Sequence, residues 1–409
     1  TQTQVALAGH PQPEPLPIPV RLGLIGEHGV LRVSLQGEVA DDFLLMLDQP
    51  AQTWKFSGVA EEPVLSLFRD LSAPVRVDYA CDDAALARLV RADSNGFNRW
   101  AAAQELATRE IVALAELIRR GDVRARAERS SVLADALAAM WPELSVADPA
   151  LAVKLLELPS LGYLAEQVTV YDPAALHAAR EQVLLAICTP LVPALRGILA
   201  RGVMLQPYVY DAEAIAGRSL ARTALDALAR LELAEAGAIA QQWLSAAPHM
   251  TAEQSALTVL VHHQLPGAEQ ALAQFHARWR HEALVLDQWF ATQASLPAAS
   301  AVEVADALLA HADFDRTVPN RVRAVVAQLA GNNPVAFHRA DGAGYALLAR
   351  EVAAIDARNP QLASRLAGAF GVWRKLDESR QTLVLAALDG LLAGELSSDT
   401  RETVQRLRG

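Results

Sequence analysis

Two patterns of hydrophobic residues divide the chain near residue 80. Before that point, short apolar runs are each bounded by Gly, Pro, Asp or Ser, which is typical of strands. Five runs fit this pattern: PVRLGLIG (19–26), DDFLLMLD (41–48), AQTWKFSG (51–58), PVLSLFRD (63–70) and APVRVDYA (73–80). Their spacing of roughly ten residues predicts a small β-sandwich. Residues 26–29, Gly-Glu-His-Gly, are expected to form a hairpin turn.

After residue 80 the apolar residues recur with a helical period, and the chain is rich in Ala and Leu. The run FNRWAAAQELATREIVALAELIRR places Trp100, Leu106, Ile111 and Leu114 near one face of a helix. Several helix starts are marked by a side-chain cap directly before a proline, which suits the first helical position. Four such pairs occur: Asp148-Pro149, Asp172-Pro173, Asn333-Pro334 and Asn359-Pro360.

These patterns predict a mainly α chain with two domains. Residues 1–80 are expected to form a small N-terminal β-sandwich of Ig-like type, and residues 81–409 an α-superhelix of stacked antiparallel helix pairs. The helices break at irregular intervals, so no named repeat is assigned. The Pro-x-Pro tract from Pro11 to Pro19 is interpreted as a stiff, extended connector.

Composition narrows the classes of function. A net charge of −11 argues against nucleic acid as a partner, because binding to phosphates depends on clustered Lys and Arg. No segment approaches the ~18 consecutive apolar residues of a membrane span, and the most apolar run is interrupted by Pro190 and Pro193. Cys81 and Cys188 are expected to be reduced, buried thiols in a cytoplasmic protein. The chain starts without Met or signal-peptide features, and its alternating first residues suggest an entry within a strand of a longer protein.

The most suggestive motif is His281-Glu282, which spells the first half of H-E-x-x-H in a segment expected to be helical. In that motif two histidines four residues apart share a helical face and bind zinc, and the Glu activates the metal-bound water. Here Val285 replaces the second histidine, and His276 lies ~140° away from His281 around the helix. The pair is therefore interpreted as part of a solvated polar face, and no metal ligand is assigned.

The other histidines and the glycines indicate no chemistry. The adjacent His262 and His263 diverge by ~100° on a helix, so one is expected inside and one at the rim. The remaining histidines of interest are isolated in sequence: His249, His311 and His338. The G-x-S-x-G, P-loop and G-x-G-x-x-G motifs are absent from the sequence, and Gly342 and Gly344 are interpreted as a tight turn before a helix.

The last candidate binding residues are two arginines near the starts of helices. Arg323 and Arg365 lie beside the amide side chains of Asn320 and Gln361. Such groups can bind peptide carbonyls or carboxylates when they face a groove, and a solvated helix end is the alternative. From the residues alone, the chain has no visible catalytic apparatus and fits a scaffold or a peptide-binding module.

Several longer stretches resemble the M1 family of zinc aminopeptidases, of the bacterial aminopeptidase N type. DSNGFNRWAAAQEL resembles the stretch R-x-D-x-F-x-R-W-x-A-x-Q that opens the family's C-terminal helical region. WRHEALVLDQWFATQAS matches the frame W-x-x-x-x-L-V-x-D-x-W-F, and LPIPVRLGLIG resembles the entry to the family's β-domain. Residues 318–366 keep P-N-R-x-R, N-P-x-x-F-H, D-G-x-G-Y and R-N-P-Q-x-A-S-R. The resemblance covers essentially the whole chain.

The resemblance implies that this chain is the C-terminal part of a longer enzyme. In that family a β-rich domain and a thermolysin-like zinc domain precede the small β-sandwich and the α-superhelix. The family's H-E-x-x-H and G-A-M-E-N motifs have no counterpart here. The parent would be a zinc metallo-aminopeptidase, a hydrolase that removes N-terminal residues from peptides, whereas this chain alone would be inactive, with no catalytic residue and no cofactor. Its implied partners are the catalytic domain of the same polypeptide and peptides, without nucleic acid or membrane.

The resemblance also implies a set of substrate-side contacts. In the family, the helical region closes over the catalytic cleft and lines its primed-side channel. Arg323, Gln361 and Arg365 match positions that face this channel, and Asn320 and Tyr345 are their expected neighbours. The chain would then control access to the active site; the alternative is a stand-alone α-helical scaffold that binds a protein or peptide partner.

Overall fold

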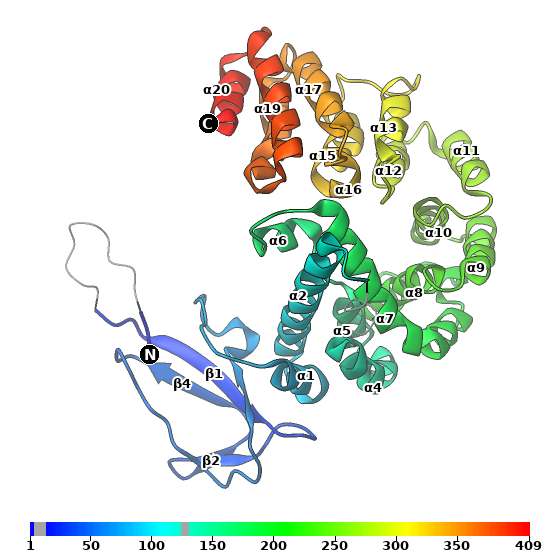
Figure 1. Ribbon diagram of the computed structural model, residues 1–409. Coiled ribbons are helices and arrows are strands. Elements are labelled where there is room, and N and C mark those ends of the chain that lie inside the picture. The colour runs from blue at the N-terminus through cyan, green and yellow to red at the C-terminus, as the bar shows by residue number, and fades with distance from the viewer. Residues whose placement is uncertain (4–13, 124–130) are drawn as a thin grey trace. The chain divides into compact units, whose positions relative to one another are not determined.

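The computed structural model describes residues 1–3, 14–123 and 131–409 (Figure 1). The chain divides into two compact units. The first consists of Thr1–Ile111, Glu128–Pro159 and Ala186–Leu191, and the second of Val112–Ala127, Ser160–Leu185 and Val192–Gly409. The long helices α2 (Gly96–Arg120) and α7 (Pro173–Ala200) contribute residues to both units.

The N-terminal region forms a β-sandwich of two three-stranded antiparallel sheets. One sheet has the strand order β4-β1-β6 and the other β3-β2-β5. The strands are β1 (Ile18–Ile25), β2 (Val33–Leu35), β3 (Glu38–Ala40), β4 (Phe43–Leu47), β5 (Phe56–Ser57) and β6 (Val64–Leu67). Alternate residues of β1, such as Val20 and Leu22, pack with Val33 and Phe43 in one buried core. The predicted N-terminal β-sandwich is therefore confirmed.

The individual strand predictions were partly right. The runs 19–26, 41–48 and 63–70 contain β1, β4 and β6, but 51–58 is a strand only at Phe56–Ser57 and 73–80 contains none. Strands β2 and β3 were not predicted, because their turn at Gln36-Gly37, with φ of 53° and 92°, lacks the usual Asn-Gly signal. The turn over residues 26–29 is confirmed, since the Gly26 N–H donates to the Gly29 carbonyl at 2.8 Å.

The residues before and at the start of β1 differ from the sequence-based expectations. Thr1–Thr3 belong to no strand, so the expected entry within a strand is wrong for these residues. Of the Pro-rich connector, residues 11–13 lie outside the described part of the chain, whereas Pro19 belongs to β1.

Helices follow the sandwich in the first unit. They are α1 (Asp83–Ala92), the N-terminal part of α2, α4 (Val132–Ala147) and α5 (Pro149–Leu156), preceded by the short 3-10 helix η1 (Arg69–Leu71). A buried ion pair joins η1 to the end of α1, because Arg69 Nη2 lies 2.7 Å from Asp93 Oδ1. The Arg69 Nε also donates to Ser66 Oγ at 3.0 Å, so the guanidinium ties the last strand to the first helix.

Apart from the end of α2, the second unit consists of helices that succeed one another along the chain, coloured from green to red in Figure 1. The earlier ones are α6 (Leu161–Glu166), η2 (Val203–Leu205), α8 (Ala212–Ala229), α9 (Leu233–Ala246), α10 (Met250–His262), α11 (Ala268–Trp279), α12 (Ala283–Ala294) and α13 (Ala301–Leu309). The later ones are α14 (Pro319–Val322), η3 (Arg323–Ala327), α15 (Gln328–Asn332), α16 (Pro334–Phe337), α17 (Ala343–Asp356), α18 (Pro360–Ala367), η4 (Gly368–Lys375), α19 (Glu378–Ala393) and α20 (Ser398–Arg408). The segment η3 has the π-helical hydrogen-bond pattern.

Sequential helices of this unit pack against each other, and alternate helices also touch. Thus α8 contacts α9 and α10, α10 contacts α12, α17 contacts α18 and α19, and α18 contacts α20. Buried apolar side chains fill the interior between them, including Phe290 in α12 and Phe337 in α16. A helical repeat array results, which confirms the predicted mainly α fold.

The four proline-marked helix starts are confirmed. The side chain of Asp148 accepts a hydrogen bond from Leu151 N–H at 3.0 Å, and the proline between them occupies the first turn of α5. The same arrangement begins α7, α16 and α18, where Asp172, Asn333 and Asn359 are the caps. The cap satisfies a backbone N–H that has no partner inside the helix, and the proline has no N–H to satisfy.

Helix α7 corrects the expectation that its prolines interrupt this apolar segment. Pro190 and Pro193 do not interrupt it, and the helix is long and apolar enough to cross a membrane by length and composition. Of its most apolar window, 44% is buried inside the structure, and the core helix of a soluble protein passes the same test. Cys188 of α7 is buried, as expected, whereas Cys81 is only half-buried.

Candidate functional site

The His281-Glu282 pair lies in the turn between α11 and α12, so the prediction of one continuous helix through it was wrong. Both side chains are exposed to solvent, as expected. Glu282 occupies the position before α12, where its side chain makes no capping hydrogen bond. Because the H-E-x-x-H site needs both histidines on one helical face, this turn removes the geometry of the motif as well as its second ligand.

The neighbouring His262 and His263 point in different directions, as their spacing predicted. His262 Nε2 lies 3.0 Å from the Thr292 carbonyl of α12, and His263 Nε2 lies 2.9 Å from Asp226 Oδ1 of α8. Both are half-buried, so the expectation of one inside and one at the rim was wrong. Each ring has a structural partner on a different helix, and the two cannot share one ion.

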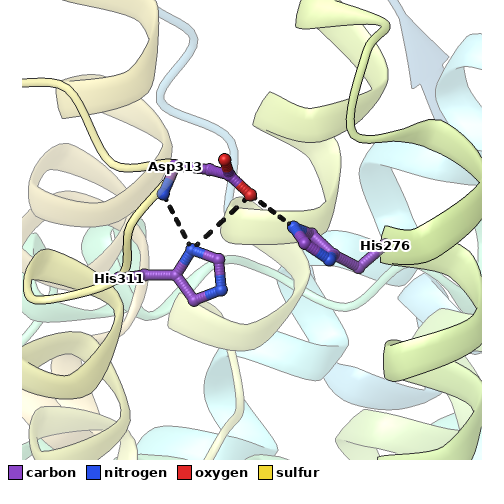
Figure 2. Close-up of side chains that lie close together, drawn as sticks. All are labelled: His276, His311 and Asp313. Atoms are coloured by element: carbon purple, nitrogen blue, oxygen red, sulfur yellow. Dashed lines mark hydrogen bonds and ion pairs between the residues drawn. The ribbon is translucent and has the colours of Figure 1, made fainter.

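A third set of histidines, isolated in sequence, comes together in space. His276 lies in the last turn of α11, and His311 and Asp313 lie just after α13 (Figure 2). One ligand atom from each residue falls within 4.8 Å of the other two. The sequence did not signal this cluster, because residues 35 or more apart have no spacing rule that joins them.

Arg323 and Asn320 form one exposed pair of the predicted channel residues. The Arg323 Nη1 donates to Asn320 Oδ1 at 2.8 Å, which orients the guanidinium. Arg323 makes no ion pair with a carboxylate within the described ranges. Most arginines close to it in the sequence do form such ion pairs. Arg316, Arg339 and Arg350, for example, pair with Glu or Asp. Arg323 also begins the π-helical segment η3, and such segments are frequent at functional sites.

Gln361 and Arg365 form the second exposed pair, on α18. They lie four residues apart, so their side chains are neighbours on one face of that helix. Both are exposed, and neither makes a side-chain hydrogen bond or ion pair with another residue that the structure describes. In that part of the chain no hydrogen bond links this pair to Arg323.

Tyr345 differs from the other predicted neighbours, because it is buried, with 1% of its surface exposed. Its hydroxyl lies 3.0 Å from His338 Nδ1, and burial raises the pKa of this hydroxyl. The α carbon of Gly344 approaches the Phe337 backbone so closely that an added Cβ would lie 2.3 Å from the Phe337 carbonyl oxygen. The structure therefore gives the N-P-x-x-F-H and D-G-x-G-Y segments a role in packing.

Other residues of the quoted motifs also have structural partners. Arg321 Nε lies 2.5 Å from Asp287 Oδ1, and the guanidinium stacks 5.0 Å from the Phe290 ring. Asn333, besides its capping role, donates to the carbonyls of Ala294 and Leu296. These contacts join α12 to the helices that follow it. Arg323, Gln361 and Arg365 differ from these motif residues because packing does not account for them.

Family models match almost the entire chain in two parts. A domain of unknown function with an Ig-like fold, DUF3458, matches residues 1–80, and one with ARM repeats, DUF3458_C, matches residues 83–409. Both domains form the C-terminal part of M1 aminopeptidase N. The chain belongs to the M1 aminopeptidase N family. The resemblance inferred from its motifs is confirmed.

Curated members of the aminopeptidase N family are similar over most of this chain. The Escherichia coli (strain K12) aminopeptidase N is 34% identical over 368 residues, which are 89% of this chain and 41% of that protein. The Caulobacter vibrioides aminopeptidase N is 36% identical over 375 residues, 90% of this chain and 42% of that protein. The chain therefore spans less than half the length of the curated relatives it matches.

A solved structure has the same fold. The crystal structure of Legionella pneumophila aminopeptidase A in complex with aspartic acid matches with a TM-score of 0.77 and 25% sequence identity. The match covers 96% of this chain and 45% of that one. The sandwich and the helical array therefore recur together in an aminopeptidase structure.

Proposed function

We propose that this chain is the cap region of a zinc aminopeptidase, which controls access to the active site and lines its primed-side channel. The relatives that support this proposal are named aminopeptidases, and the chain matches less than half of each. The H-E-x-x-H motif is absent from this sequence, so the chain's own residues do not hold the zinc that would activate water. Peptide hydrolysis would therefore take place on another part of the same polypeptide, and the isolated chain would be inactive.

The environment of the Arg323 and Arg365 guanidinium groups is the observation that supports the channel role. Both guanidinium groups are exposed and, among the described residues, no carboxylate neutralises them. A guanidinium presents a fork of N–H donors that fits a carboxylate or a peptide carbonyl. With Gln361 one helical turn from Arg365, these groups would hold the main chain or the C-terminal carboxylate of a peptide. They would bind the substrate without taking part in the chemical step.

The test uses the full-length parent enzyme with Arg323→Ala or Arg365→Ala. Loss of one charge-assisted hydrogen bond should lower kcat/KM for peptides of four or five residues by about 10-fold or more. An alanyl chromogenic amide is too short to reach these arginines in the proposed channel, so its kcat/KM should change by less than about twofold. Arg222→Ala is the matched control, because Arg222 is also exposed and helical but lies outside the quoted motifs.

Two results would contradict the channel role of the arginines. The first is an equal loss for peptides and for the chromogenic amide, which would indicate a general structural defect. The second is an equal loss in Arg222→Ala and in the channel variants. Hydrolysis of the chromogenic amide by the isolated 409-residue chain would contradict the assignment of the chemistry to another part of the polypeptide.

A further inference from the structure

His276, His311 and Asp313 approach one another from two neighbouring parts of the helical array (Figure 2). His276 Nε2 lies 2.7 Å from Asp313 Oδ2, and His311 Nδ1 lies 3.9 Å from the same oxygen. We propose that these three side chains bind one zinc ion. The sequence assigned no metal ligand to this chain, and the proposal revises that expectation. It does not depend on the channel role of the arginines.

The three ligand atoms are close to the spacing that a zinc ion needs. With zinc–ligand bonds of 2.0–2.1 Å, the ligand atoms of a tetrahedral site lie about 3.3 Å apart. The His276–Asp313 distance would lengthen by about 0.6 Å and the His311–Asp313 distance would shorten by about the same amount. The two ring nitrogens, which lie within 4.8 Å of each other, would approach by about 1.5 Å at most, a change within the reach of side-chain rotations.

Each ring nitrogen already has a hydrogen-bond partner, and zinc would have to replace both of these hydrogen bonds. The backbone N–H of Asp313 donates to His311 Nδ1 at 3.1 Å, so that nitrogen is unprotonated and the ring proton is on Nε2. His276 presents its Nε2 to the Asp313 carboxylate. When zinc replaces the proton shared by His276 and Asp313, each imidazole contributes one nitrogen and the carboxylate one oxygen.

The surrounding residues hold the two rings in place. Trp289 packs against His276 and His311, with ring centroids 4.8 Å and 5.3 Å away. The Trp289 indole N–H donates to the Leu272 carbonyl at 3.0 Å, which fixes this ring in turn. Arg321, held by Asp287, donates to the Asp313 carbonyl. Fixed rings and a fixed loop reduce the entropy that a metal ion would otherwise have to overcome.

The charge of the three-residue cluster and its exposure to solvent also suit a cation. The carboxylate of Asp313 lies between the two rings and offers the ion an oxygen ligand that can balance part of its charge. The side chains of His276, His311 and Asp313 are 19%, 32% and 37% exposed, which leaves an entry route and a fourth position for water. Two imidazoles favour zinc over Mg²⁺ or Ca²⁺, which prefer oxygen ligands.

The test is a calorimetric titration of the metal-free 409-residue chain with zinc chloride. One zinc should bind per chain, and Asp313→Asn or His311→Asn should each weaken binding by about 10-fold or more. Asparagine at position 313 still accepts a hydrogen bond, so the fold should persist, as circular dichroism would verify. His281→Asn is the control, because this exposed histidine lies in the nearby turn and should leave binding unchanged.

Cobalt(II) gives a second, spectroscopic readout, which reports the coordination of the bound ion, and circular dichroism again verifies that the variant folds. Bound to the wild-type chain, it should show the visible absorption of a four- or five-coordinate ion, and this absorption should vanish in His276→Asn. The absence of saturable zinc binding would overturn the proposal. So would equal affinity in the wild type and the three ligand variants, because the ion would then be bound elsewhere.

Discussion

The buried histidine of the N-P-x-x-F-H segment should make the stability of the chain depend on pH. His338 is 6% exposed, its Nδ1 lies 3.0 Å from the Tyr345 hydroxyl, and the rings of Phe337 and Tyr171 pack against it. Burial, with a smaller contribution from the charge of Arg380, lowers the pKa of His338 to about 3. The folded chain therefore keeps this ring neutral at a pH where the unfolded chain would charge it.

The size and sign of the effect follow from proton linkage. In the unfolded chain the His338 pKa returns to its ordinary 6.5, so between pH 6.5 and about 3 the unfolded state binds more protons. Stability conferred by the neutral ring is complete above pH 6.5 and is lost as the pH falls through this window. From pH 7 to pH 5 the loss should be about 2 kcal/mol, and it approaches about 5 kcal/mol near pH 3.

Urea unfolding of the wild type and of His338→Asn, followed by circular dichroism at pH 7 and pH 5, measures this loss. Asparagine places a polar atom near the position of Nδ1, so it can still bind the Tyr345 hydroxyl, but it does not titrate. The variant should be less stable at pH 7 and should lose about 2 kcal/mol less than the wild type on going to pH 5. His281→Asn, an exposed change, should behave as the wild type. If wild type and His338→Asn lose the same free energy, the reasoning is wrong.

Two further pairs of variants test the buried ion pair of Arg69 and the close packing at Gly344. Arg69→Met leaves Asp93 charged and buried, so it should destabilise the chain by about 3–5 kcal/mol in urea unfolding. Adding Asp93→Leu should restore most of this loss, and no restoration would contradict the ion-pair account. Gly344→Ala should lower the Tm, because its Cβ would lie 2.3 Å from the Phe337 carbonyl oxygen. Gly331→Ala, in helix α15 with nothing within 4 Å, should instead add up to about 1 kcal/mol, and equal effects of the two would refute the packing argument.

The sequence predicted the elements whose signals are local. The Asx-Pro pairs gave four helix starts because the cap and the proline act within one turn, and each cap is present as expected. The strands β2 and β3 were missed because each has only three residues, too few to show a period. The α11–α12 break was missed because Arg280 and His281 carry no glycine or proline signal.

The candidate sites depend on distances that no local pattern contains. The His276–His311–Asp313 cluster requires the packing of α11 against the loop after α13, so three ordinary polar residues gain their meaning only in the fold. The residues alone marked Arg323 and Arg365 as possible peptide contacts, and the family resemblance implied their channel role. The structure added that both are exposed without a carboxylate partner in the described residues. The same resemblance grouped Tyr345 with them, although its burial gives it a different environment.

The π-helical turn at Arg323–Ala327 makes chain length, as well as side-chain chemistry, a determinant of this region. Its i→i+5 pattern takes up one residue more than an α-helical turn. The turn therefore absorbs one extra residue without turning Gln328–Asn332 away from the core, and Leu329 remains fully buried. Deleting one residue there would let the backbone close as an ordinary α-helix with Leu329 still facing the core. Relatives that are one residue shorter at this turn should therefore keep the same buried face and differ only in the direction of side chains within the turn, such as that of Arg323.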